Sequence, residues 1–119
     1  MGVWEPDGAE RLIVGLMSGT SADGIDAAVC EIAGSGRETR ARILYCDTTP
    51  YPPDVRAEVL ALSTPGTVVL ARLCRLGYAL GELFAEAALA AIAAAGLEPV
   101  RVHLIASHGQ TLCHLPQPA

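Results

Sequence analysis

Residues 15–26 read GLMSGTSADGID, and this stretch decides how the first part of the chain folds. One apolar run, residues 12–17, leads into it, and a second, residues 25–32, follows it. Two apolar runs joined by a short loop that is rich in small residues and contains Asp-Gly are typical of a β-hairpin. The sequence therefore predicts two antiparallel strands with a polar tip between them.

The tip of this hairpin has the residue types that bind phosphate. Glycine lets backbone N–H groups approach a ligand closely, and the hydroxyls of Thr20 and Ser21 add further donors. Asp23 and Asp26 would repel a bare phosphate, so their presence makes sense if a divalent cation lies between carboxylate and phosphate. An ordinary polar hairpin turn is the alternative that spacing alone leaves open.

Three better-known loops do not fit this stretch. A Walker A loop needs Gly-Lys-Ser/Thr, and the chain contains no lysine. The spacing of Gly15, Gly19 and Gly24 does not match the G-x-G-x-x-G fingerprint, which also requires a helix to follow. The esterase motif G-x-S-x-G is absent because Leu16 and Met17 precede Ser18. A strand–loop–strand phosphate site remains.

Composition limits the function classes. The chain has 119 residues, room for one small domain, and 51% of them are hydrophobic, enough for a core. The net charge is −5 and the eight basic residues are scattered arginines, which argues against a nucleic-acid partner. Cys30, Cys46, Cys74 and Cys113 form no C-x-x-C pair, and no export signal precedes them, so we expect reduced thiols and a cytoplasmic location.

Periodicity and turn residues give a coarse order of elements. We expect strands at residues 12–17, 25–32 and 39–49, helices at 54–62 and 67–95, and a last strand at 102–107. Pro53 suits a first helical turn, Thr67 an N-cap, and Gly96 a helix stop. In the third strand, alternation places Ala41, Ile43 and Tyr45 on one face and Arg40, Arg42 and Leu44 on the other.

The largely apolar segment 76–97 raises the question of a membrane. Glu82 and Glu86 lie within it, and each would cost roughly 2.5–3.5 kcal/mol in a bilayer. The sequence therefore predicts a soluble helix and no membrane partner.

Two loops are expected to meet at one edge of the sheet. Ligand loops in open α/β sheets lie at the carboxyl ends of strands. If the strands at 12–17 and 102–107 are parallel neighbours, the loops at 18–21 and 107–110 open into one cleft.

The quoted stretch resembles the N-terminal signature of the anhydro-N-acetylmuramic acid kinases, a family of the actin-like, sugar-kinase ATPase superfamily. Residues 106–111, ASHGQT, followed by His114 and Pro116, are similar to the family's SHGQT-x-x-H-x-P segment. The resemblance covers about residues 12–116. It implies an α/β fold: an incomplete ribonuclease-H-like (actin-like ATPase) lobe, β-β-β-α-α-β with a mixed sheet. Residues 1–11 would be a tail and 12–119 the N-terminal part of the first lobe, the second lobe being absent.

The resemblance also implies a reaction and its cofactors. The family uses ATP and Mg²⁺ to convert 1,6-anhydro-N-acetylmuramic acid, with water, to N-acetylmuramic acid 6-phosphate in peptidoglycan recycling. The phosphate grip would comprise Gly19, Thr20, Ser21, Ala22, Asp23, Gly24, Ile25 and Asp26. Asp23 and Asp26 would hold Mg²⁺ through water, and Ser18, His108 and Gln110 would lie on the substrate side.

Other readings of the histidines stay in view. His108 could instead cap the end of its strand as a structural residue. The group His103, His108, Cys113 and His114 matches no common zinc pattern. We therefore expect no zinc site there.

One family element does not occur in this sequence. The family's catalytic aspartate belongs to an Asp-Thr-Gly-Pro-Gly-Asn-type segment, which is not found among the 119 residues. We therefore expect no catalytic residue in this chain, which looks like an N-terminal portion, and no sugar-dependent ATP turnover by it alone. Two alternatives to the kinase interpretation stay open. The chain could be a non-catalytic nucleotide- or phosphate-binding module, or a structural domain with a chance hairpin. The expected partner is a small amino sugar, and a homodimer of the full-length enzyme stays open.

Overall fold

The computed structural model describes residues 9–117, so most of the expected tail at residues 1–11 lies outside the described part. Arg11 already begins the first strand. The elements, in chain order, are β1 (Arg11–Ser18), β2 (Gly24–Ala33), η1 (Gly36–Glu38), β3 (Arg40–Pro50), α1 (Pro53–Ser63), α2 (Leu70–Ala94), η2 (Pro99–Arg101) and β4 (Leu104–Gln110). The α/β class with a mixed sheet is confirmed.

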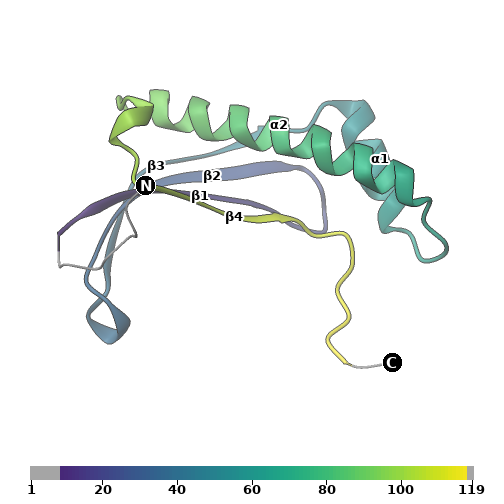
Figure 1. Ribbon diagram of the computed structural model, residues 1–119, viewed down its shortest axis with the longest axis horizontal. Coiled ribbons are helices and arrows are strands. Elements are labelled where there is room, and N and C mark those ends of the chain that lie inside the picture. Colours follow the sequence, from purple (N-terminus) through teal and green to yellow (C-terminus); the bar gives the residue numbers. More distant parts are fainter. Residues whose placement is uncertain (1–8, 118–119) are drawn as a thin grey trace.

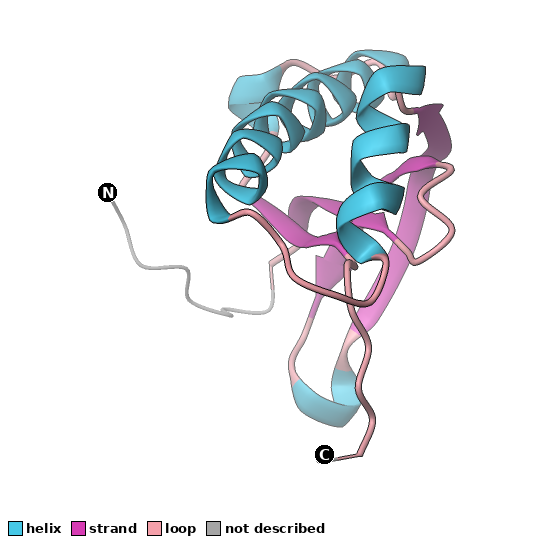
Figure 2. Ribbon diagram, turned by 90° about the vertical axis from the view of Figure 1, so that its right-hand side faces the viewer, coloured by secondary structure: helices cyan, strands magenta, loops and turns pink. Residues whose placement is uncertain are grey.

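The four strands form one sheet in the order β3-β2-β1-β4. β2 is antiparallel to both β1 and β3, whereas β4 is parallel to β1. Both α-helices lie over the same face of the sheet (Figure 1 and Figure 2). Among the described residues no helix covers the opposite face, which is called the open face below.

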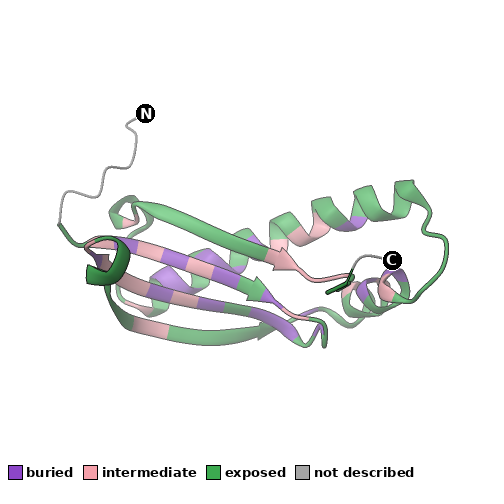
Figure 3. Cartoon of the chain, turned by 90° about the horizontal axis from the view of Figure 1, so that it is seen from below, coloured by how far each residue is buried: buried purple, intermediate pink, exposed green. Residues whose placement is uncertain are grey.

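The core lies between the sheet and α2. Leu12, Val14 and Leu16 alternate along β1 with less buried residues, as expected for a strand with one face in the core (Figure 3). α2 contributes a stripe of buried side chains at helical spacing: Leu76, Phe84, Ala87, Ala88, Ala91 and Ile92. Each large apolar side chain buried in this way contributes roughly 1.5–3 kcal/mol.

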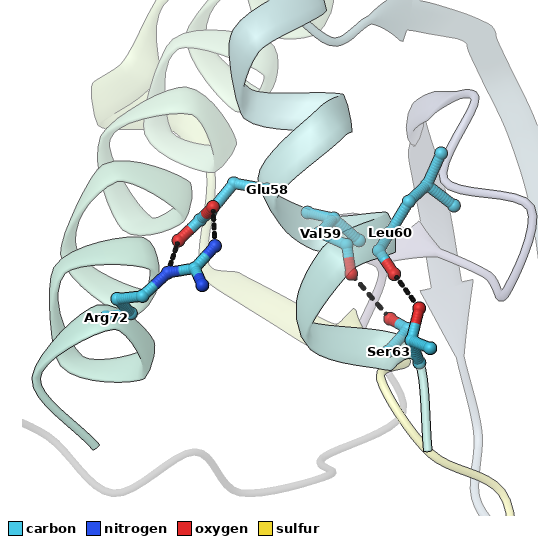
Figure 4. A network of polar contacts seen from close by, with 6 residues as sticks. Glu58, Val59, Leu60, Ser63 and Arg72 are labelled. Carbon is cyan, nitrogen blue, oxygen red and sulfur yellow. Dashed lines mark hydrogen bonds and ion pairs between the residues drawn. The ribbon is translucent and has the colours of Figure 1, made fainter. Parts of the chain in front are cut away.

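An ion pair joins the two helices. The Arg72 guanidinium donates two hydrogen bonds to the Glu58 carboxylate, of 2.6 and 2.9 Å (Figure 4). Near the end of α1, the Ser63 hydroxyl donates to the Val59 carbonyl over 2.6 Å. Because both side chains of the Arg72–Glu58 pair remain partly exposed, we expect it to contribute little to the free energy of unfolding.

The helix ends agree only partly with the sequence. Pro53 is in the first turn of α1 and Gly96, at φ +75°, follows the end of α2, as predicted. Thr67 as N-cap is wrong: α2 begins at Leu70, and its N-cap, Val69, makes no side-chain capping bond. The start of α2 therefore has no side-chain N-cap, and its residues before Leu76 are exposed.

A register shift changes the predicted faces of β3. Val29 of β2 pairs with Tyr45 and the next residue, Cys30, pairs with Ile43, so Leu44 has no partner of its own. Such a bulge breaks the alternation of side chains. Leu44 and Tyr45, which were predicted on opposite faces, consequently both pack against the core.

β4 also extends further than predicted. It continues to Gln110 through a second bulge, where the sequence predicted a loop at 107–110. Leu16 pairs with Ser107 and Ser18 with Gln110, so β4 holds one extra residue between these pairs. Gly109 has φ +78°, a conformation in which a residue without Cβ is favoured.

α2 is long and apolar enough to cross a membrane by length and composition, with a mean hydropathy of 1.4. The core helix of a soluble protein can have the same composition, and 33% of the most apolar stretch is buried inside this structure. The rest of that stretch is not buried by the described residues.

The close approach of β2 and β3 at Gly24 gives a test of the fold. A Cβ on Gly24 would overlap the Thr49 carbonyl oxygen and lie 2.9 Å from the Pro50 Cα. We expect Gly24→Ala to lower the free energy of unfolding by about 1–3 kcal/mol, because backbone must move. Urea unfolding measures the change.

Gly15→Ala is the matched control, since nothing lies within 4 Å of its added Cβ. It should change stability by less than about 0.5 kcal/mol. Equal losses in the two variants would contradict the close packing at Gly24.

Candidate functional site

The tip of the first hairpin, residues 19–23, is a tight turn with a buried base and an exposed rim. The Gly19 carbonyl accepts a hydrogen bond of 3.1 Å from the Ala22 N–H, and Ala22 has φ +52°. Ala22 is buried, whereas Thr20, Ser21 and Asp23 are exposed. The turn therefore presents its hydroxyls and a carboxylate to solvent while Ala22 anchors it.

The end of β4 holds the tip in place, as the parallel pairing predicts. The Gln110 side chain donates from Nε2 to the Gly19 carbonyl over 2.8 Å. The Thr111 N–H donates to the Ser18 carbonyl over 3.1 Å. The two sequence blocks, which lie far apart in the chain, are thus joined directly.

The two loops meet as expected, but His108 and Gln110 of the second loop line different spaces. Gln110 lines a cavity of about 600 Å³ between α2 and β4, whose walls are mostly apolar side chains such as Leu76 and Phe84. His108 instead lines a shallow hollow on the open face together with Asp26. The bulge at Gly109 separates the two, because it adds a residue between neighbouring pairs and so reverses the alternation.

The two carboxylates of the predicted site have different partners. Asp26 accepts through Oδ1 a hydrogen bond of 2.5 Å from the Thr48 hydroxyl on β3. The Asp23 carboxylate, 75% exposed, lies 3.7 Å from the Arg56 guanidinium on α1. Mg²⁺ is usually bound through one or two carboxylates, water and substrate phosphates. Asp26 contacts β3 and lines the hollow on the open face, whereas Asp23 contacts α1, so the two carboxylates share no partner among the described residues.

Arg56 belongs to the site although nothing in the sequence singled it out. Besides its ion pair with Asp23, its Nη2 donates to the Ser21 carbonyl over 3.3 Å. An exposed ion pair of this kind contributes about 0.2–1 kcal/mol. The guanidinium reaches the tip because α1 packs beside the hairpin, a tertiary arrangement that local sequence patterns do not encode.

Within residues 9–117, no three His, Cys, Asp or Glu side chains gather closely enough to hold a metal ion. His103 instead completes the pairing between β1 and β4. Its imidazole Nδ1 accepts from the Leu12 backbone N–H over 3.0 Å, and its backbone N–H donates to the Leu12 carbonyl over 2.9 Å.

Two buried hydroxyls lie beneath the tip. Ser18 is 1% exposed and Tyr51, which follows β3, is 6% exposed. Neither hydroxyl has a hydrogen bond of good geometry within the described residues. Burial raises the pKa of Tyr51, and the opposing effect of the nearby Ser18 hydroxyl is smaller. Tyr51 was not predicted from the sequence.

Comparison with known proteins agrees on one family. The family model described as anhydro-N-acetylmuramic acid kinase matches residues 11–119. The chain is similar to a protein of that name from Caldanaerobacter subterraneus subsp. tengcongensis, with 49% identity over 90% of this chain and 27% of the relative. It is also similar to a protein of the same name from Francisella tularensis subsp. novicida, with 43% identity over 87% of this chain. The protein of that name from Salinibacter ruber is 38% identical over 93% of this chain. The matched region makes up 27% and 28% of the length of these two relatives, so the chain spans little more than a quarter of the curated relatives it matches.

The buried Tyr51 hydroxyl predicts a specific response to alkaline pH. Its raised pKa means that the folded state keeps a proton that the unfolded chain releases near pH 10.0. The resulting stabilisation is complete below that pH and is lost as pH rises through the folded-state pKa. We expect Tyr51→Phe to lose less stability than the unmodified chain between about pH 9 and pH 11, measured by urea unfolding.

Tyr78→Phe removes the hydroxyl of a tyrosine that is 78% exposed and serves as the control. It should follow the unmodified chain over the same range. If Tyr51→Phe also did so, the account of a buried, proton-retaining hydroxyl under the tip would be wrong.

Proposed function

This chain belongs to the anhydro-N-acetylmuramic acid kinase family, and on that premise we propose that residues 19–26 bind the phosphates of ATP in a kinase acting on 1,6-anhydro-N-acetylmuramic acid. The product would be N-acetylmuramic acid 6-phosphate, formed in peptidoglycan recycling. The relatives extend well beyond the region that they share with this chain, and the resemblance places the catalytic aspartate outside that region. Phosphate binding, rather than proton transfer, is the role proposed for these residues.

The observation that carries the proposal is the exposed tip on a fixed base. Thr20 and Ser21 present hydroxyl donors to solvent, while Gln110 and Thr111 hold the preceding residues by hydrogen bonds. Phosphoryl transfer depends mainly on positioning and on neutralising charge, so donors that need no rearrangement are favourable. Ala22, Gly24 and Ile25 are buried, and they would contribute through the backbone and through packing.

Asp23 and Asp26 are proposed to hold Mg²⁺ through water. When bound, Mg²⁺ neutralises charge on the phosphate oxygens and orients them. The Thr48 hydroxyl fixes the Asp26 carboxylate from the neighbouring strand, which supports an oriented water-mediated ligand. Exposure of Asp23 leaves its carboxylate accessible to a hydrated cation.

The substrate-side residues receive different proposed roles. Gln110 lines the cavity beside α2 and His108 the hollow on the open face, so the two residues are proposed to lie on the substrate side at different places. Ser18 is buried, and we propose that it supports the tip from below rather than touching the sugar. The amide of Gln110 and the imidazole of His108 can each form hydrogen bonds with the hydroxyl and acetamido groups of a sugar.

The wider assignment follows the family. Residues 12–119 are proposed to be part of a ribonuclease-H-like, actin-like ATPase lobe, consistent with the mixed sheet and its helices. We propose a cytoplasmic transferase whose partner is a small amino sugar. A homodimer of the longer enzyme is a further proposal that rests on the resemblance alone.

Nucleotide affinity tests the proposal. We expect Thr20→Val and Asp26→Asn each to weaken binding of ATP–Mg²⁺ about tenfold or more, because a hydrogen bond to a charged group contributes roughly 1.5–3 kcal/mol. Isothermal titration calorimetry on the purified chain gives the dissociation constants.

Two matched controls make the same kinds of side-chain change away from the tip and should leave the affinity for ATP–Mg²⁺ unchanged. They are Thr67→Val, at an exposed threonine before α2, and Glu98→Gln, just before η2. Binding that is insensitive to both tip substitutions would place the nucleotide elsewhere and contradict the proposal.

A further inference from the structure

Arg56 brings a positive charge to the rim of the proposed phosphate loop. Its Nη2 lies 3.3 Å from the Ser21 carbonyl oxygen and 3.7 Å from an Asp23 carboxylate oxygen. We propose that Arg56 is a phosphate-binding residue, which leaves Asp23 and binds the polyphosphate of the nucleotide when the ligand arrives. This inference rests on the proposed function and adds to it a residue that the family motif does not include.

The charge of the tip is the first argument. Asp23 and Asp26 are both exposed in and beside the turn, so the tip itself is acidic. The polyphosphate of ATP carries several negative charges, and the chain has no lysine to balance them. Hydroxyl and backbone donors alone do not offset this repulsion. A guanidinium that already contacts the tip adds a positive charge to that of the Mg²⁺ proposed above.

The geometry of the ion pair is the second argument. The Arg56 and Asp23 side chains are 45% and 75% exposed, and 3.7 Å is longer than a charge-assisted hydrogen bond. Such a loose, solvated pair is easily exchanged. A guanidinium presents several N–H donors in a planar fork, which matches two phosphate oxygens better than this distant carboxylate.

The exchange also gives Asp23 a consistent role. Before the ligand binds, the carboxylate faces Arg56, and a hydrated cation would have to compete with that guanidinium. Once Arg56 moves to the phosphate, the Asp23 carboxylate is available to the hydrated Mg²⁺ proposed above. The hydrogen bond to the Ser21 carbonyl places the Arg56 guanidinium next to the turn before the ligand binds.

A purely structural role for Arg56 makes a different prediction. If the guanidinium only tied α1 to the hairpin, its removal would lower thermal stability without a specific effect on phosphate binding. The test therefore needs affinity and stability from the same variants. It also needs a ligand that lacks the nucleoside, so that phosphate contacts are measured separately from the rest of the nucleotide.

The experiment compares the unmodified chain with its Arg56→Gln and Arg56→Lys variants. For each, we would measure the dissociation constants for ATP–Mg²⁺ and for inorganic tripolyphosphate, and the melting temperature. Arg101→Gln, the same charge change in η2 at the other end of α2, is the control. Arg56→Gln should weaken both ligands about ten- to hundredfold, and Arg56→Lys should lose less. Arg101→Gln should bind as the unmodified chain does.

Asp23→Asn gives a second test, in which the expected change has the opposite sign. Asp23→Asn should tighten tripolyphosphate binding in the absence of Mg²⁺, both by removing a repelling charge and by releasing Arg56. The gain should be smaller when Asp23→Asn is introduced into Arg56→Gln, where only the first effect remains. A gain of the same size in the double variant would overturn the inference.

The remaining outcomes separate the inference from the proposed function. If ATP–Mg²⁺ binds the unmodified chain and Arg56→Gln equally well, the role of Arg56 is overturned and the proposed function stands. Binding of tripolyphosphate alone, dependent on Arg56, would support the inference and count against nucleotide binding. If the unmodified chain binds neither ligand, both are overturned.

Discussion

The parallel pairing of β4 with β1 is the interaction on which the proposed site depends. β1 is hydrogen-bonded on one side to its hairpin partner and on the other to a strand that arrives after two helices. That second pairing brings Gln110 to the Gly19 carbonyl and Thr111 to the Ser18 carbonyl. Without it the tip would be an ordinary hairpin turn, held only by its own strands.

The division of the tip into buried and exposed residues follows from this support. Ala22, Gly24 and Ile25 are packed into the domain, and the close contact of Gly24 with β3 leaves no space for a side chain. The exposed hydroxyls and carboxylates are consequently held on a base that cannot easily move. Preorganised donors of this kind are what phosphoryl-transfer sites require, since rearrangement on binding would cost affinity.

Local patterns predicted the hairpin, the other strands and the helices, because alternation and helical spacing are properties of neighbouring residues. The α/β class with a mixed sheet was implied by the family resemblance. Local patterns failed where a single extra residue changes the register. His108 and Gln110 are two residues apart and would share a face in a regular strand, but the bulge at Gly109 places them on opposite faces. Arg56 and Tyr51 reach the tip only through the packing of α1 and the end of β3, so no local signal could reveal them.

The most direct test of the central claim, that the hairpin tip binds nucleotide phosphates, is a titration of the ¹⁵N-labelled chain with ATP–Mg²⁺ followed by amide NMR. The account predicts that the backbone signals of residues 19–24 and the side-chain amide of Gln110 shift together and saturate. Signals of η1 (Gly36–Glu38), at the other end of the sheet, should stay in place. Shifts confined to the cavity beside α2 or to the open face, with the tip unchanged, would contradict the account.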